Sequence, residues 1–271
     1  MEIIYSIIAG VIQGLTEFLP ISSSGHLVLF HDFLGFDFVD NLSFDVVLHL
    51  GTLVALVLFF WRDISDYAKA WLQSFTAWDL KNNIRQRLAW YILIATLPAA
   101  IVGYFLEEPI ENVFRDSFLV AAMLIGFGVI LYLADRFSAK SAGIEQLNLK
   151  SSFLIGIGQA IALIPGVSRS GITIIAGLSQ KLNREASARF SFLLSIPIVF
   201  AAGLKKMLGL SNHPLENFDM ILLSVGFLAS AITGYLCIKY FLQFLQKHSL
   251  KVFAYYRIIL GIIIIFLLWR S

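Results

Sequence analysis

Cysteine is almost absent from this chain of 271 residues, in which Cys237 is the single example. One cysteine excludes an intrachain disulfide and any metal site built on several thiolates. Charged residues are also scarce, at 14% of the chain against roughly 25% in soluble globular domains. Because 58% of the residues are hydrophobic, the sequence predicts an integral membrane protein.

A basic stretch is missing near the start of the chain. Residues 1–20 run into Glu17 without the positively charged segment of a secretory signal, so we expect no cleaved leader. The net charge is only +2, and the basic residues gather in loops between apolar segments. We therefore predict membrane lipids, and no nucleic acid, as partners.

Long apolar runs are what the chain does contain. A helix needs about 17–25 residues to cross a hydrocarbon core of about 30 Å. Six stretches meet or approach this length, approximately 44–61, 88–106, 117–134, 189–204, 218–238 and 252–269. Regions 2–36 and 152–183 are also apolar but are interrupted at 20–25 and 165–171. Each half is too short to span, so we predict two re-entrant helical hairpins.

The two interrupted regions resemble each other. A constant shift of 146 positions aligns Gly10/Gly156, Gln13/Gln159, Ser22/Ser168, Ser24/Ser170, Gly25/Gly171 and Phe44/Phe190. We predict one transmembrane domain, 1–271, that contains internal repeats at about 1–135 and 147–271. Chance similarity between apolar segments is the alternative.

The distribution of basic residues predicts the orientation. Loop 62–87 holds five arginines and lysines, whereas loop 107–116 holds one arginine and four acidic residues. The positive-inside rule places the first loop in the cytoplasm and the second outside. Both termini then lie outside, and the hairpins enter from opposite faces. The expected fold is an all-α polytopic membrane protein with an inverted-topology repeat, whose broken helices meet near the midplane.

Polar residues are concentrated at the two interruptions. Glu17, His26 and Arg169 lie where hydrocarbon is expected, and an ionisable group there marks a functional site by default. We expect half-helices to begin near His26 and near Ile172. A helix start offers free N–H groups and a positive dipole end to an anion. The residues predicted to bind a phosphate or diphosphate are Ser22, Ser24, Gly25, Ser168, Arg169, Ser170 and Gly171.

Individual side chains have further predicted roles. The planar Arg169 guanidinium matches phosphate in two-point contact. Glu17 shares a helix face with Gln13, and its oxygens suit a hard divalent cation such as Mg²⁺ or Ca²⁺. His26 is the natural general acid or base, and Ser23 is a nucleophile within its reach. Which of the two attacks phosphorus stays open.

Structural interpretations stand beside these roles. Serine and glycine next to proline can simply end helices, and Arg169 can be a counter-ion to Glu17. We interpret His49, in the stretch 44–61, as an interhelical hydrogen-bonding residue.

Residues 13–26 and 165–173 together resemble the motifs of the bacterial undecaprenyl-diphosphate phosphatase family of bacitracin-resistance proteins. The likeness covers the whole chain in length and in the order of apolar segments. It implies hydrolysis of undecaprenyl diphosphate to undecaprenyl phosphate and phosphate in the bacterial cytoplasmic (inner) membrane. That reaction recycles the carrier lipid of peptidoglycan synthesis and confers resistance to bacitracin.

The resemblance also implies roles for particular residues. By this resemblance Glu17 is the catalytic or metal-binding carboxylate, and Ser23 and His26 belong to a Ser-Gly-His element of the site. Ser168, Arg169 and Thr173 then lie around the phosphates. It further implies divalent-cation dependence, a pocket reached from the outer face, and homodimers.

One position departs from the family pattern. Gln13 stands where glutamate is commoner, which puts in doubt a mechanism that requires two carboxylates but not one that relies on Glu17 alone.

Two other functions stay open. Inverted repeats with half-helices at the midplane are also transporter architecture, so a secondary transporter or a polyprenyl-lipid flippase is the main alternative. The phosphatidate-phosphatase type resembles a pattern with a second histidine six residues after the arginine. This chain has Ile175 there, which makes that type a poor match.

Overall fold

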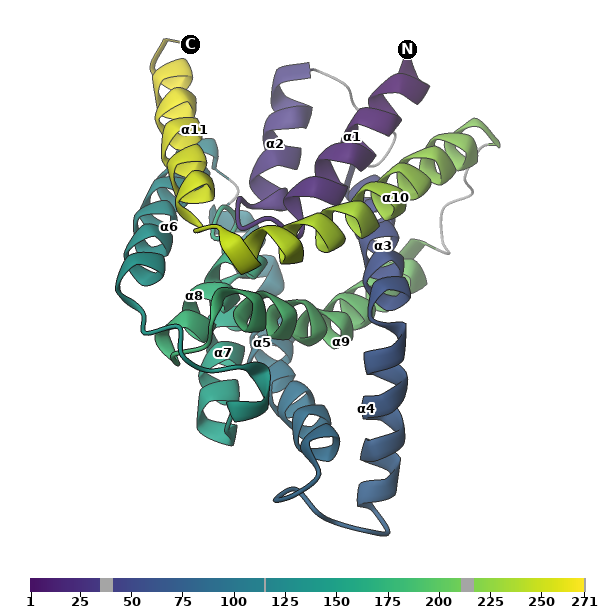
Figure 1. The fold of residues 1–271 in the computed structure, drawn as a ribbon. Coiled ribbons are helices and arrows are strands. Elements are labelled where there is room, and N and C mark those ends of the chain that lie inside the picture. Colours follow the sequence, from purple (N-terminus) through teal and green to yellow (C-terminus); the bar gives the residue numbers. More distant parts are fainter. Residues whose placement is uncertain (35–40, 115, 211–216, 271) are drawn as a thin grey trace.

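The fold is described from a computed structural model that places residues 1–34, 41–114, 116–210 and 217–270. Within these ranges the backbone alone is described for residues 28, 31–34, 41–43, 107–114, 206–210, 217–218 and 270. The described chain folds into α-helices and one short 3₁₀ helix, Ile144–Gln146, with no strand (Figure 1). The predicted all-α class is confirmed.

The two hairpins consist of short helices. The first is α1 (Glu2–Thr16) with α2 (Ser23–Leu34), and the second is α7 (Leu149–Ile161) with α8 (Arg169–Ser179). The longest, α1, has 15 residues, which at about 1.5 Å per residue cannot cross a core of about 30 Å. In Figure 1, α1 runs inward from the N-terminus and α2 returns beside it.

The second helix of each hairpin begins three residues earlier than predicted. It starts at Ser23 in α2 and at Arg169 in α8, not near residues 26 and 172. The cause is serine capping. The Ser22 hydroxyl accepts from the Gly25 N–H at 3.3 Å, and Ser168 caps α8 in the same way. Residues expected to precede the helices therefore form their first turns.

Five long helices match five of the six predicted spans. These helices are α5 (Ile84–Phe114), α6 (Ser117–Phe137), α9 (Arg184–Leu210), α10 (Asn217–Lys247) and α11 (Lys251–Arg270). Their segments long and apolar enough to cross a membrane are, in the same order, Ile84–Leu106, Ser117–Phe137, Arg184–Lys205, Asp219–Lys247 and Lys251–Trp269. The described residues therefore form a multi-pass membrane protein by helix length and composition. The segment observed at the fourth predicted span, 189–204, is longer than expected, because it begins at Arg184.

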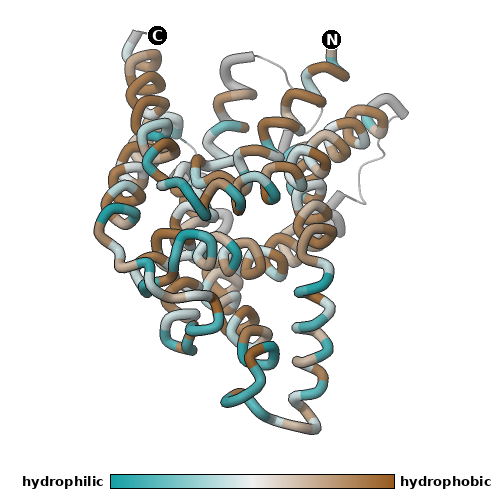
Figure 2. Tube along the Cα trace, in the orientation of Figure 1, coloured by the Kyte–Doolittle hydropathy of each residue, from teal (hydrophilic) through white to brown (hydrophobic). Residues whose placement is uncertain are grey.

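The remaining predicted span, 44–61, ends at a bend. It corresponds to α3 (Asn41–Phe59), which meets α4 (Trp61–Ser74) at 77°. The two helices together are long and apolar enough for a broken span or a re-entrant loop. Residues 62–74 are therefore helix, although the sequence predicted a loop over 62–87. Hydrophilic and hydrophobic residues alternate along α4 (Figure 2), so the apolar run ends while the amphipathic helix continues. The expected loop 107–116 is likewise helical as far as Phe114.

Each hairpin packs its first helix closely against a long helix. A Cβ atom added at Gly10 of α1 would lie 2.5 Å from the Gly226 carbonyl oxygen of α10. A Cβ atom at Gly156 of α7 would overlap the Ala95 carbonyl oxygen of α5. Small residues at such points let helix backbones approach in a membrane. Gly10 and Gly156 are an aligned pair, so this parallel supports the proposal of an internal duplication.

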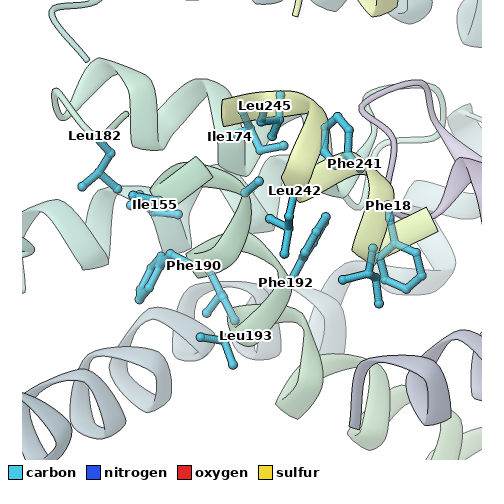
Figure 3. Packing of buried hydrophobic residues seen from close by; sticks show 14 of the residues in the cluster. Phe18, Ile155, Ile174, Leu182, Phe190, Phe192, Leu193, Phe241, Leu242 and Leu245 are labelled. Carbon is cyan, nitrogen blue, oxygen red and sulfur yellow. The ribbon is translucent and has the colours of Figure 1, made fainter. Parts of the chain in front are cut away.

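Among the described residues, the largest buried apolar cluster brings Phe18, which precedes the first break, together with residues of α9 and α10 (Figure 3). Phe18 is fully buried, and its ring meets the Phe192 ring of α9 edge-on, with centroids 5.3 Å apart. Phe192 in turn lies 6.2 Å from the Phe241 ring of α10. Buried aromatic pairs of this kind contribute more than their area alone. The packing of Phe18 thereby holds the neighbouring Glu17 in place.

The two termini lie at one end of the molecule, and the loop after α4 lies at the other (Figure 1). We predict that single cysteines at Glu2 and Trp269 react with an impermeant thiol reagent from outside the cell, whereas one at Lys81 reacts only from the cytoplasm. All three positions are exposed. The buried Cys237 is replaced by alanine as background. Labelling of all three from one side would contradict the predicted topology.

Candidate active site

One cavity of about 210 Å³ receives residues from both hairpins. Apolar residues of α5 and α9, together with Ala162 and Leu163 just after α7, form part of its wall. Its polar lining is Glu17, Ser23, Ser24, His49, Gln159, Ser168 and Arg169. The two breaks, 146 positions apart in the sequence, thus open into the same space.

The Glu17 carboxylate is the centre of the polar network. Arg169 Nη2 donates to Oε1 in an ion pair that joins the two hairpins. Oε2 accepts from the Gln13 amide at 3.0 Å and from the Ser23 hydroxyl at 2.7 Å. Glu17 is only 7% exposed, and a buried carboxylate needs such partners. Arg169 is therefore the counter-ion of Glu17, and this ion pair is itself part of the site.

His49 joins this network from α3. Its Nδ1–H donates to the Asp45 carbonyl oxygen at 2.8 Å, and its Nε2 lies 3.6 Å from Glu17 Oε2. The sequence analysis interpreted His49 as an interhelical hydrogen-bonding residue and gave it no role at the site. The criterion that singled out Glu17, an ionisable group in an apolar segment, applies equally to His49.

His26 does not line the cavity. Its Nδ1–H donates to the Ser22 carbonyl oxygen at 2.7 Å, and its Nε2 accepts from the Tyr256 hydroxyl at 2.7 Å. The two rings stack with centroids 5.7 Å apart. Both nitrogens of His26 are thus engaged with α11 and the capping turn. The structure pairs Ser23 with Glu17, not with His26 as the sequence suggested.

The two capping turns have the same geometry. Ser22 and Ser168 both adopt the left-handed backbone conformation, with φ of 76° and 73°. Each hydroxyl lies 3.3 Å from that of a second serine, Ser24 or Ser170. Left-handed conformations at residues other than glycine are strained and concentrate at functional sites. The aligned sequence copies therefore build matching local structures.

The predicted phosphate-binding residues divide into two groups. Ser24, Ser168 and Arg169 line the cavity. The other group is buried and absent from the cavity lining, and consists of Ser22, Gly25, Ser170, Gly171 and Thr173. Ser170 donates to the Leu19 carbonyl oxygen at 3.0 Å, and the Thr173 hydroxyl lies 2.6 Å from that of Ser191. The hydrogen bonds of this second group hold the two turns in the conformation that places Ser24, Ser168 and Arg169 at the cavity.

Arg257 of α11 joins the two breaks from behind. It is fully buried. Its guanidinium donates to the carbonyl oxygens of Pro20 at 3.2 Å, Gly166 at 2.9 Å and Val167 at 3.0 Å. Pro20 belongs to the first break, and the other two belong to the second. Sequence reasoning missed Arg257, although an arginine within the apolar stretch 252–269 was the available signal.

One unused acceptor beside Glu17 suits a divalent cation. Gln13 Oε1 is buried and accepts no hydrogen bond within the described part of the chain, and the same side chain contacts Glu17. The described residues contain no group of three histidines, cysteines or acids able to hold a metal. Phosphate oxygens and water would have to complete the shell, as is usual for Mg²⁺.

Comparison with known proteins identifies the family. The model of the bacitracin resistance protein BacA family matches residues 6–263. The chain belongs to the BacA family. Three curated relatives, each named undecaprenyl-diphosphatase, come from Geotalea daltonii (46% identical over 262 residues, 96% of each chain), Rubrobacter xylanophilus (44% over 270 residues, 99% of each) and Methanobrevibacter smithii (42% over 273 residues, 97% of each). The BacA match includes both breaks and Arg257.

Proposed function

We propose that this BacA-family chain hydrolyses undecaprenyl diphosphate to undecaprenyl phosphate and inorganic phosphate. The names of its relatives support this substrate. The observation that carries the reaction is the 2.7 Å hydrogen bond from the Ser23 hydroxyl to Glu17, in a cavity that Arg169 also lines. A hydroxyl held by a carboxylate beside a guanidinium combines a nucleophile, a base and a phosphate-binding group.

In the first step Ser23 Oγ attacks the terminal phosphorus, and its proton passes to Glu17 Oε2. The bond from that phosphorus to the bridging oxygen breaks, and undecaprenyl phosphate leaves. In the second step the oxygen of water bonds to phosphorus and the Oγ–phosphorus bond breaks. Glu17 returns its proton to Ser23, and both water protons remain on the released phosphate. A divalent cation held by Gln13, Glu17 and the phosphates would offset their negative charge.

Arg169 binds the phosphates with the nitrogen that Glu17 leaves free. Its Nη2 is engaged by Glu17, whereas Nη1 is buried with no hydrogen-bond partner among the described residues. One guanidinium therefore orients the base and is open to a phosphoryl oxygen. His49, near the same carboxylate, adds a second cationic group when protonated.

The setting of the enzyme belongs to the same proposal. We place it in the cytoplasmic membrane of a bacterium, with the cavity reached from the outer face and two copies forming a homodimer. Its reaction returns the carrier lipid to peptidoglycan synthesis, which is the basis of the bacitracin resistance in the family name.

Adjacent serines provide a matched test of the nucleophile. Ser23→Ala should lower kcat for phosphate release by about a thousandfold, because the attacking oxygen is lost. Ser24→Ala should mainly raise KM, because the Ser24 hydroxyl lines the cavity and hydrogen-bonds Ser22 but not Glu17. The measurement is phosphate release from undecaprenyl diphosphate in detergent. Equal effects of the two variants would remove Ser23 from the covalent step.

A further inference from the structure

Gln159 of α7 is a buried amide for which the protein supplies no partner. Its side chain is 2% exposed, and neither Oε1 nor Nε2 has a hydrogen-bond partner among the described residues. A buried polar group left unpaired carries its full desolvation penalty. Gln159 lines the cavity that Glu17 and Arg169 also line. The open space that its amide can reach is therefore the candidate active site.

The aligned glutamine of the first hairpin shows what is missing. Gln13 donates to Glu17, which stands four residues later. Four residues after Gln159 the chain has Leu163, which also lines the cavity but has no polar atom in its side chain. The second copy keeps the glutamine without the acid that holds it in the first copy. Some other group has to take the place of that acid.

The charge of that group follows from the donors nearby. Arg169 Nη1 is also buried without a hydrogen-bond partner in the described chain, and it comes from the same hairpin. Two unused N–H groups at one cavity suit an anion whose oxygens only accept hydrogen bonds. Glu17 is not that anion for Gln159, because its donors are Arg169, Gln13 and Ser23 and no hydrogen bond joins it to Gln159.

We infer that Gln159 is a substrate-binding residue whose Nε2–H donates to a phosphoryl oxygen of the lipid diphosphate, beside Arg169 Nη1. This inference rests on the proposed function and deepens it. The two copies of the repeat then have different tasks. The first hairpin provides Ser23 and Glu17 for bond making and proton transfer, and the second provides Gln159 and Arg169 to hold the phosphates.

Gln159→Met tests this assignment, because methionine keeps the length of the side chain and removes both polar atoms. KM for undecaprenyl diphosphate should rise about tenfold, with kcat within about twofold of wild type, since the lost contact serves substrate and transition state alike. Inorganic phosphate should protect the variant from thermal unfolding less well than it protects wild type. Gln159→Glu should raise KM more, because it brings a negative charge to the phosphates.

Thermal stability without ligand separates binding from a structural role. Removing an unpartnered amide should leave the unfolding midpoint of Gln159→Met equal to or above that of wild type. Ile157→Met is the control, since Ile157 is 40% exposed on α7 and lies outside the cavity lining. A lower midpoint with unchanged KM and unchanged protection by phosphate would overturn the inference.

Failure of the proposed hydrolysis can be distinguished from failure of the Gln159 assignment. If wild type released no phosphate from undecaprenyl diphosphate, the hydrolytic reaction would be wrong. Protection by inorganic phosphate would still test Gln159. Protection of wild type that is weakened in Gln159→Met would support the binding role, and equal protection of both proteins would overturn it.

Discussion

Replacing Glu17 by glutamine should lower kcat for phosphate release by on the order of a thousandfold, because an amide cannot accept the Ser23 proton. The structure gives the loss a second cause. Arg169 is paired with the Glu17 carboxylate, and a neutral partner leaves that partly buried guanidinium uncompensated. The measurement is phosphate release from undecaprenyl diphosphate at several Mg²⁺ and Ca²⁺ concentrations, with monodispersity in detergent as the control for folding.

Gln13→Glu is the matched exchange in the same network. It restores the residue that is commoner in the resembled motif, and we expect activity to be retained. The added carboxylate should change the apparent cation affinity, because the number of charged ligands tunes cation binding. A folded Glu17→Gln protein with ordinary turnover would remove Glu17 from the mechanism.

Arg169→Lys should lower kcat/KM by about tenfold to a hundredfold, the equivalent of about 1.5–3 kcal/mol for a hydrogen bond to a charged group. The sequence predicted that both prongs of the guanidinium grip phosphate. In the structure Nη2 binds Glu17, and Nη1 has no hydrogen-bond partner among the residues placed. A single ammonium group cannot reproduce the two fixed directions of a guanidinium, so it cannot orient the base and bind phosphate equally well.

Arg184→Lys is the matched control for this exchange. Arg184 forms a two-point ion pair with Asp135, at 2.6 Å and 3.2 Å, and neither residue lines the cavity. We expect this variant to keep its kcat/KM. If Arg169→Lys behaved like Arg184→Lys, the role of Arg169 would be general electrostatic balance and not phosphate binding.

The architecture was largely predictable because its signals are local. A long apolar run indicates a span wherever it occurs, and a polar Pro-Gly-Ser interruption shortens the helices on either side. The bend of 77° between α3 and α4 was not predicted. It depends on α4, an amphipathic helix that continues beyond the apolar run. A prediction from hydropathy alone ends the helical region with that run, before α4.

The site was predictable where its residues lie inside the two motifs. The motifs led to Glu17, Ser23 and Arg169, which the fold brings into one cavity. His26 lies in the same motif, but its ring turns to Tyr256 of α11. The direction of a side chain depends on the helices packed around it, and spacing alone does not give this.

The missed residues come from outside the two motifs. His49 belongs to α3, Gln159 to α7 and Arg257 to α11. The alignment of the repeats contained Gln159, yet its lack of a partner appears only when Leu163 is seen in the position that corresponds to Glu17. Arg257 binds backbone carbonyl oxygens of both breaks, and backbone acceptors leave no trace in a motif.

The most direct test of the central claim is the reaction itself. Purified wild-type protein, monodisperse in detergent and supplied with undecaprenyl diphosphate and Mg²⁺, should release one inorganic phosphate per lipid and leave undecaprenyl phosphate. Detergent removes the two compartments that transport requires, so release under these conditions is hydrolysis. Intact undecaprenyl diphosphate after prolonged incubation, together with movement of the lipid between leaflets in vesicles, would contradict the account and favour a flippase.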